Sequence, residues 1–253
     1  MTDDGAAEQS PGQMTGVIHR ISGPVICHHS PQARSSVVAV LQLRLRAMAR
    51  PKSSQHDLKR EAILDIAALC FARQSYSAAS MNDIAAATGT SKARLYHYYD
   101  SKEAILFDLL DRYTQRLLAI VGETEATAQR RNMDERAALH ELVRAFLAEY
   151  ETSATRHVAL LHDTQFLSVV THPGQSISQR ELILNRQRDV VSTFTRFLRR
   201  AYPQRLNPTN QTAITMMLMG MINWTFTWLR PGGRLSYAAF ADEVIGMLEK
   251  GLS

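Results

Sequence analysis

Residues 80–99 read SMNDIAAATGTSKARLYHYY and carry the strongest structural signal in the chain. Ile84 and Ala85 supply the buried side of a short first helix, and the small Ala85 lets a second helix cross it closely. Gly89 follows at a point where a connecting turn needs a residue that tolerates a positive φ angle. The stretch therefore predicts a helix-turn-helix.

The second helix of this motif has a polar and basic surface. Thr90 or Ser91 can cap its N-terminus with a hydroxyl group. Leu95 and Tyr98 lie three residues apart, so we expect both to face the core. Four larger side chains are then left pointing outward: Lys92, Arg94, Tyr96 and His97. Such a face suits the phosphates and base edges of DNA, and an ordinary helical hairpin with a solvated face is the alternative.

Composition places the chain among ordinary globular proteins. It has 253 residues, of which 45% are hydrophobic and 21% charged, and its net charge is +5. A positive balance fits an anionic partner without requiring one. The two cysteines, Cys27 and Cys70, give no disulfide framework. The acidic opening MTDDGAAEQS lacks the apolar core of a secretory signal, and the apolar run over 213–229 is interrupted and too short for a membrane span. We expect a cytoplasmic protein with no membrane association.

The beginning of the chain differs from the rest. Residues 1–47 contain several prolines and glycines and no sustained apolar period, whereas 48–52 resembles a natural protein start. We therefore expect residues 1–51 to be a disordered extension, either flexible or translated from an upstream start codon chosen in error. The helix-turn-helix domain should occupy 52–100, and a second, helical domain should occupy 101–253.

Apolar side chains at helical spacing continue through the second domain, with no alternating strand pattern. The fold class is therefore expected to be all-α, with three N-terminal helices around the helix-turn-helix. Beyond it, helices are predicted over about 101–121, 133–152, 153–170, 176–202, 209–229 and 236–252. Trp224 and Trp228 should lie four residues apart on one face of the helix over 209–229, in a pocket or interface wall or in plain core packing.

The sequence contains none of the catalytic motifs that would indicate an enzyme. It has no nucleophile elbow, no phosphate-cradling glycine loop and no His-Glu metal motif. His157 and His162 are five residues apart and miss the spacing that would place both on one helix face, so we expect no metal and no cofactor. A DNA-binding protein without a ligand is another alternative, but reading DNA needs only about 60 residues, far fewer than this chain has.

Three features together resemble one protein family: a helix ahead of the helix-turn-helix, the string TGTSKARLYHYYDSKEAIL at 88–106, and the helical remainder. The chain is similar to the TetR-type family of one-component bacterial transcriptional regulators, strongly over about 56–110 and more weakly beyond. The resemblance implies a homodimeric repressor that a small molecule releases from double-stranded operator DNA. It also implies that the C-terminal helices bind this effector and form the dimer.

The resemblance assigns DNA contacts to matching positions. Ser80 and Lys102 would meet phosphates, and Tyr96 and His97 would meet the DNA backbone. The start of the recognition helix would face base edges: Thr90, Ser91, Lys92, Ala93 and Arg94. Ala93 replaces a glycine that is frequent in the family, so the base contacts could differ in detail. Physical chemistry agrees, since a helix N-terminus favours phosphate and arginine can pair bidentately with guanine.

The C-terminal segment MINWTFTWLRPGGRLSYAAFADEVIGMLEKGL at 221–252 resembles a subset of the family that responds to acyl-CoA thioesters. A regulator of efflux or detoxification genes that responds to a free aromatic or lipophilic compound is the alternative. Aromatic walls with a few polar groups are typical of small-molecule sites, and the candidate pocket residues are Tyr150, His162, Phe166, Asn223 and Trp228.

Two further features bear on the partners of this domain. The helix over 176–202 carries several arginines, which form either a solvated face or contacts to the phosphates of a CoA group. The helices over 209–229 and 236–252 should pair with their copies in a four-helix dimer interface. We expect Leu218 and Ile245 to lie in that apolar seam.

Overall fold

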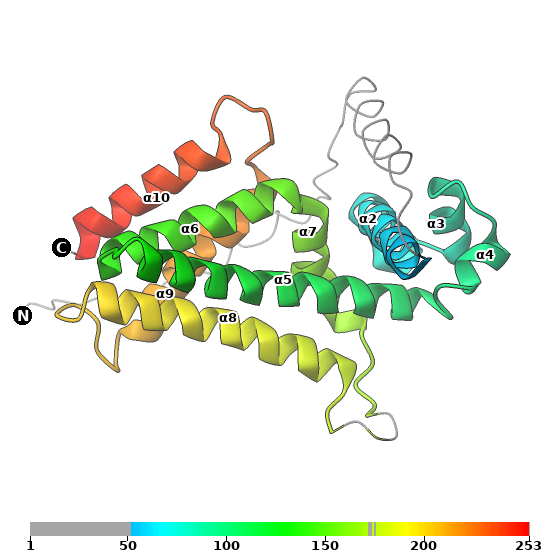
Figure 1. Cartoon of the computed structure of the whole chain (residues 1–253), viewed down its shortest axis with the longest axis horizontal. Coiled ribbons are helices and arrows are strands. Elements are labelled where there is room, and N and C mark those ends of the chain that lie inside the picture. Colours follow the sequence, from blue (N-terminus) through cyan, green and yellow to red (C-terminus); the bar gives the residue numbers. More distant parts are fainter. Residues whose placement is uncertain (1–51, 172–173, 175, 253) are drawn as a thin grey trace, which may run out of the picture. The chain divides into compact units, whose positions relative to one another are not determined.

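The computed structural model describes residues 52–171, 174 and 176–252, so the expected extension over 1–51 lies outside the described residues. The described residues belong to one compact unit. Its elements in chain order are α2 (Lys52–Ala78), α3 (Met81–Ala87), α4 (Lys92–Tyr96), α5 (Lys102–Arg130), α6 (Glu135–Thr152), α7 (Ala154–Asp163), η1 (Thr164–Phe166), α8 (Gln179–Ala201), α9 (Gln211–Asn223), η2 (Trp224–Thr227) and α10 (Tyr237–Leu252) (Figure 1). The predicted all-α class is confirmed. Among these helices, none is both long and apolar enough to cross a bilayer.

Helices α2, α3 and α4 form the part that we call the head. The buried face of α2 packs on α3 and on the start of α5. Ser75 adopts a positive φ of 69° and interrupts the helical backbone near the end of α2. Gly89 has a φ of 66° in the turn between α3 and α4, as the sequence predicted.

The core contacts of α4 differ in one detail from the prediction. Leu95 is fully buried, as expected. Tyr98, however, is only partly buried and packs against the ring of His56, whereas its neighbour Tyr99 is buried. Helix α4 ends at Tyr96, so a helical spacing carried past this end does not decide which of the two tyrosines is buried.

We call α5 to α10 the body. Helix α5 is the part of the body that adjoins the head. The hydroxyl oxygen of Ser101 caps it by accepting a hydrogen bond from the Ala104 N–H. The helix continues to Arg130, nine residues beyond the predicted end at Val121. Its last turns lack large apolar residues, and there Thr124 is buried and Ala128 packs against the core.

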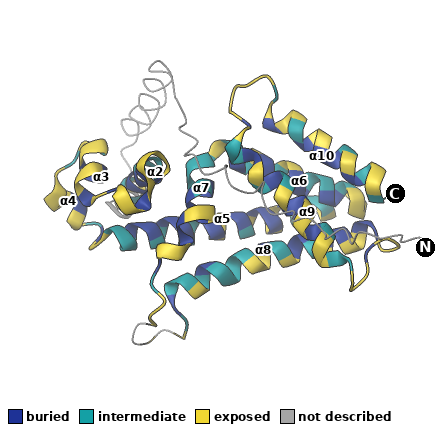
Figure 2. Cartoon of the chain, turned by 180° about the vertical axis from the view of Figure 1, so that it is seen from behind, coloured by how far each residue is buried: buried dark blue, intermediate teal, exposed yellow. Residues whose placement is uncertain are grey.

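The body packs α6, α7 and α8 around α5, and α10 covers α6 (Figures 1 and 2). Its core is rich in aliphatic and aromatic side chains, and the rings of Phe146 in α6 and Phe194 in α8 meet edge to face at 4.8 Å. The buried faces of these helices point toward one another, while their outer faces are exposed (Figure 2). Burial of these apolar faces stabilises the fold.

The structure corrects the helix predicted over 209–229. Helix α9 ends at Asn223, and Trp224–Thr227 forms the 3₁₀ segment η2. The hydroxyls of Thr225 and Thr227 donate to the backbone carbonyls of Ile222 and Trp224, which competes with regular α-helical bonding. Trp224 and Trp228 therefore do not share one face of an α-helix.

Candidate nucleic-acid interface and effector core

A reciprocal capping box fixes the start of α3. The Ser80 hydroxyl oxygen accepts a hydrogen bond from the Asp83 N–H (3.2 Å), and the Asp83 carboxylate accepts one from the Ser80 N–H (2.9 Å). The Ser80 hydroxyl also donates to this carboxylate (2.6 Å). These bonds from Ser80 lower the pKa of Asp83. Ser80 is exposed, so its oxygen stays accessible beside the first helix of the motif.

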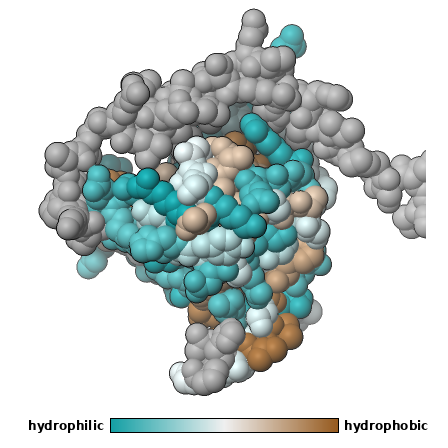
Figure 3. All heavy atoms as spheres, turned by 90° about the vertical axis from the view of Figure 1, so that its right-hand side faces the viewer, coloured by the Kyte–Doolittle hydropathy of each residue, from teal (hydrophilic) through white to brown (hydrophobic). Residues whose placement is uncertain are grey.

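The predicted recognition residues lie on and beside α4. The Ser91 hydroxyl oxygen accepts from the Arg94 N–H (3.2 Å) and so caps the helix, and Leu95 anchors it in the core. Thr90 is half-buried, and the other predicted residues are exposed: Ser91, Lys92, Ala93, Arg94, Tyr96 and His97. Figure 3 views the end of the molecule that carries α3 and α4, where the visible surface is mainly hydrophilic. Apart from the half-buried Thr90, these side chains are thus accessible on and beside α4.

Lys102 has partners within the protein. Its ammonium group donates to the backbone carbonyls of Tyr76 (2.7 Å) and Ala79 (2.7 Å), with a longer contact to Ser77 (3.4 Å). It also lies 4.3 Å from the centre of the Tyr76 ring. All three ammonium donors therefore have acceptors at the junction of α2 and α3, and a phosphate contact would have to displace one of them.

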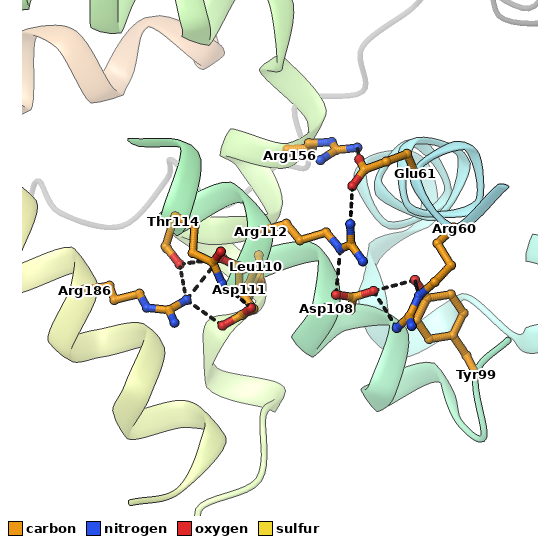
Figure 4. A network of polar contacts seen from close by, with 11 residues as sticks. Arg60, Glu61, Tyr99, Asp108, Leu110, Asp111, Arg112, Thr114, Arg156 and Arg186 are labelled. Atoms are coloured by element: carbon orange, nitrogen blue, oxygen red, sulfur yellow. Dashed lines mark hydrogen bonds and ion pairs between the residues drawn. The ribbon is translucent and has the colours of Figure 1, made fainter. Parts of the chain in front are cut away.

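A polar network beneath the head was not anticipated from the sequence (Figure 4). Asp108 in α5 accepts hydrogen bonds from Tyr99 (2.6 Å), Arg60 (3.0 Å) and Arg112 (2.8 Å). Burial raises the pKa of Asp108, but the hydrogen bonds from Tyr99 and Arg112 outweigh this effect, so the net pKa is lowered. Asp108 and Arg112 have the i,i+4 spacing of a helix pair, which is the one sequence signal that could have revealed part of this network.

The five predicted effector residues do not meet in one place. Tyr150 and Asn223 do meet, because the Tyr150 hydroxyl donates to the Asn223 side-chain oxygen (2.9 Å). The remaining three are exposed and pack elsewhere: His162 against Phe226, Phe166 against Tyr76, and Trp228 against Phe240. Two surface clefts of the described body, one between α5 and α6 and one beside the end of α5, contain none of the five.

The seam residues predicted for the dimer lie inside the protomer. Leu218 in α9 and Ile245 in α10 are both buried, so neither is available to a second copy. The exposed apolar residues of this region are instead Met216, Met217, Trp224, Trp228 and Met247. The expected interface helices therefore do carry an apolar outer face, but other residues form it.

Half of the arginines on α8 are already paired. Arg186 bonds to Asp111, Arg196 to Glu125 and Arg200 to Glu135. In the described part of the chain, Arg180, Arg188 and Arg199 have no such carboxylate partner. Much of this basic helix thus serves to join α8 to α5 and α6.

Comparison with known proteins identifies the two parts of the chain separately. The family model described as bacterial regulatory proteins of the tetR family matches residues 63–109, and the model described as tetracyclin repressor-like, C-terminal domain, matches residues 132–252. A solved TetR-family transcriptional regulator from Bordetella parapertussis 12822 is 34% identical, with a TM-score of 0.66, and the match covers 74% of this chain and 92% of that one.

Two further relatives extend the comparison. The transcriptional repressor KstR2 of Rhodococcus jostii (strain RHA1) is 34% identical over 102 residues, which is 40% of this chain, and the chain spans only 47% of that relative's length. The solved structure of AibR in complex with isovaleryl coenzyme A and operator DNA is 26% identical, with a TM-score of 0.59 over 74% of this chain and 96% of that one. These relatives are transcriptional regulators rather than enzymes. The chain belongs to the TetR family of bacterial regulatory proteins.

Proposed function

We propose that this chain is a transcriptional repressor that binds double-stranded operator DNA through α4. The observation that carries the proposal is the exposed surface of α4, which is anchored from beneath by the buried Leu95. Among the described residues, neither Lys92 nor Arg94 has an acidic partner, so both charges are available to DNA. Lys92 lies over the Tyr96 ring at 5.9 Å, which supports a common contact surface for a phosphate.

Selection of bound duplexes from a random-sequence pool tests this function. The wild-type protein should enrich one sequence with two related half-sites spaced by about one helical turn of DNA or a multiple of it. Failure to enrich any sequence at low salt would contradict the proposal.

We infer further that two copies associate through the outer face of α9, η2 and α10. Ala213, Met217, Gly220 and Trp224 follow one another at helical spacing and are all exposed. The small Ala213 and Gly220 would let a helix of a second copy approach closely, while Met217 and Trp224 would supply apolar contact area. Contiguous apolar surface of this kind is uncommon on monomers and typical of interaction sites. A dimer would also place two recognition helices on successive half-sites.

An acyl-CoA thioester is the effector that we propose, bound among the helices of residues 133–229. Support comes from the similarity to AibR, which was solved with isovaleryl coenzyme A, and from the C-terminal segment 221–252. Arg180, Arg188 and Arg199 of α8 have no carboxylate partner among the described residues, so they offer charge to the CoA phosphates. The test is release of operator DNA by acyl-CoA thioesters, with the matching free acids and CoA alone as controls. Release by free acids alone would favour the alternative of a free lipophilic compound.

A further inference from the structure

Two buried aromatic side chains of the body, Tyr113 and His157, have polar atoms that lack well-formed hydrogen bonds to the described residues. Tyr113 in α5 is 1% exposed, and His157 in α7 is 2% exposed. Within the described part of the chain, the Tyr113 hydroxyl has no hydrogen-bond partner. The two ring nitrogens of His157 have no partner in good geometry, although the backbone of Asn223 lies close to the ring. Most buried polar groups in folded proteins are hydrogen-bonded, so three such atoms within one cluster need an explanation.

The two residues belong to a cluster built from four helices. The His157 ring stacks on the Tyr150 ring of α6 with centroids 3.7 Å apart, and it meets the Tyr113 ring edge to face at 6.1 Å. The Tyr150 hydroxyl is already bonded to Asn223 at the end of α9. Asn223 is half-buried, so the cluster reaches from the core to the surface beside η2.

The cluster presents neutral groups and no free charge. Burial lowers the pKa of His157 to about 3, an effect that the nearby backbone of Asn223 opposes only in part, so the ring is neutral at neutral pH and offers one donor and one acceptor. The adjacent cation, Arg156, is bound to Glu61 and Asp65. A carboxylate placed here would lose its hydration without gaining a cationic partner.

We propose that Tyr113 and His157 form the polar anchor of the effector site and bind an uncharged oxygen group of an otherwise apolar ligand. A thioester, ester or ketone carbonyl fits, because it accepts hydrogen bonds from the Tyr113 hydroxyl and the His157 N–H and carries no charge. This inference rests on the proposed function and narrows it, since it selects the carbonyl of an acyl thioester over a free acid.

Direct binding without DNA tests the anchor. Octanoyl-CoA, methyl octanoate, 2-octanone and octanoic acid are titrated into the full chain at pH 7.5 by calorimetry. We expect at least one neutral carbonyl compound to bind about tenfold or more tightly than octanoic acid. Tyr113→Phe and His157→Phe should each weaken that binding about tenfold, the scale of one lost hydrogen bond. Tyr237→Phe is the matched control, because its hydroxyl already faces the Leu229 carbonyl (3.4 Å).

Unfolding in urea separates an anchor from a structural role. Tyr113→Phe should leave the free energy of unfolding unchanged or raise it, because the hydroxyl has no partner among the described residues that it could lose. Three outcomes would each overturn the inference. The first is destabilisation of the protein by Tyr113→Phe, and the second is wild-type affinity in both anchor variants. The third is tighter binding of octanoic acid than of the neutral carbonyl compounds. A wild type that binds operator DNA but none of the four compounds would overturn it too, while leaving the DNA-binding proposal intact. Binding of a neutral carbonyl compound by a protein that recognises no operator would instead contradict the proposed function alone.

Discussion

The guanidinium group of Arg156 in α7 bonds to the carboxylate of Glu61 in α2, with 2.8 Å between Nη2 and Oε2. The other oxygen of Glu61 accepts from Arg112 in α5 (2.8 Å), so this carboxylate joins three helices (Figure 4). The next residue of α7, His157, is buried in the body. Within the short helix α7, Arg156 thus contacts the head, and the next residue, His157, belongs to the proposed effector anchor. A ligand that moved α7 would act on α2 directly.

Arg156→Gln tests the importance of this link for stability. The change removes the cation shared by Glu61 and Asp65, and Arg156 is largely buried, so we expect a loss of about 1–2 kcal/mol in the free energy of unfolding. Urea unfolding followed by circular dichroism is the measurement. Glu123→Gln is the control, because its bond to Arg116 is exposed and should contribute less than about 1 kcal/mol. Equal stability of Arg156→Gln and wild type would show that the link is dispensable.

Arg94→Ala should weaken operator binding by about 1–3 kcal/mol and relax specificity at one base pair, because the guanidinium can pair with a base edge. Affinities are measured for the operator and for single-base variants of it. Arg199→Ala removes the same charge from an exposed position of α8 and should leave specificity unchanged. If both variants lose affinity equally on all sequences, α4 does not read bases through Arg94.

Lys102→Gln should act on stability more than on DNA contacts. Its ammonium group binds backbone carbonyls at the junction of α2 and α3, so its loss leaves several acceptors unpaired. We expect a destabilisation of about 1–3 kcal/mol. The slope of log K against log salt should stay unchanged, whereas a lost phosphate contact would reduce it by about 0.9. A reduced slope with unchanged stability would contradict this prediction and support the phosphate contact that the family resemblance implies.

Local sequence signals predicted the head well because its features depend on single residues. Gly89 supplies the positive φ of the turn, and Ser91 caps α4, so each can be recognised without tertiary information. The prediction placed Tyr98 in the core, whereas Tyr99 is the buried tyrosine. The error arose because the helical spacing was extended past the end of a five-residue helix. The effector cluster had no such local signal, since Tyr113, Tyr150 and His157 come from three different helices.

Sequence patterns also could not predict which face of α9 is exposed for the proposed dimer. Helix α9 contains MMLMGMI and is apolar on nearly every side, so periodicity alone cannot tell the face buried within the protomer from the face left outside. Leu218 and Met217 are neighbours in sequence, yet Leu218 is fully buried and Met217 is 67% exposed. Only the packing of α9 on α8 and α10 distinguishes them.

This contrast gives a matched pair of substitutions for the dimer. Met217→Arg should produce a folded monomer, because the charge would enter the seam between copies and not the protomer core. Leu218→Arg should instead unfold the protein, because the charge would be buried without a partner. Light scattering at micromolar concentration reports the mass, and circular dichroism reports the fold. A Met217→Arg protein that remains dimeric would place the interface elsewhere.

Asp163 should make stability depend on pH. It is buried at the end of α7, and burial raises its pKa to about 6. The unfolded chain ionises this residue near pH 4, whereas the folded protein holds the proton until about pH 6. Stability should therefore fall as pH rises through this window and then level off, because the folded state must then bear a charged carboxylate that burial disfavours. Asp163→Asn keeps the shape without the charge and should be more stable than wild type by about 1–3 kcal/mol at pH 7.5. Urea unfolding at pH 4.5 and 7.5 measures the difference between the two proteins, which cancels the titration of all other groups. A difference that does not shrink at pH 4.5 would show that the charge of Asp163 is not its cause.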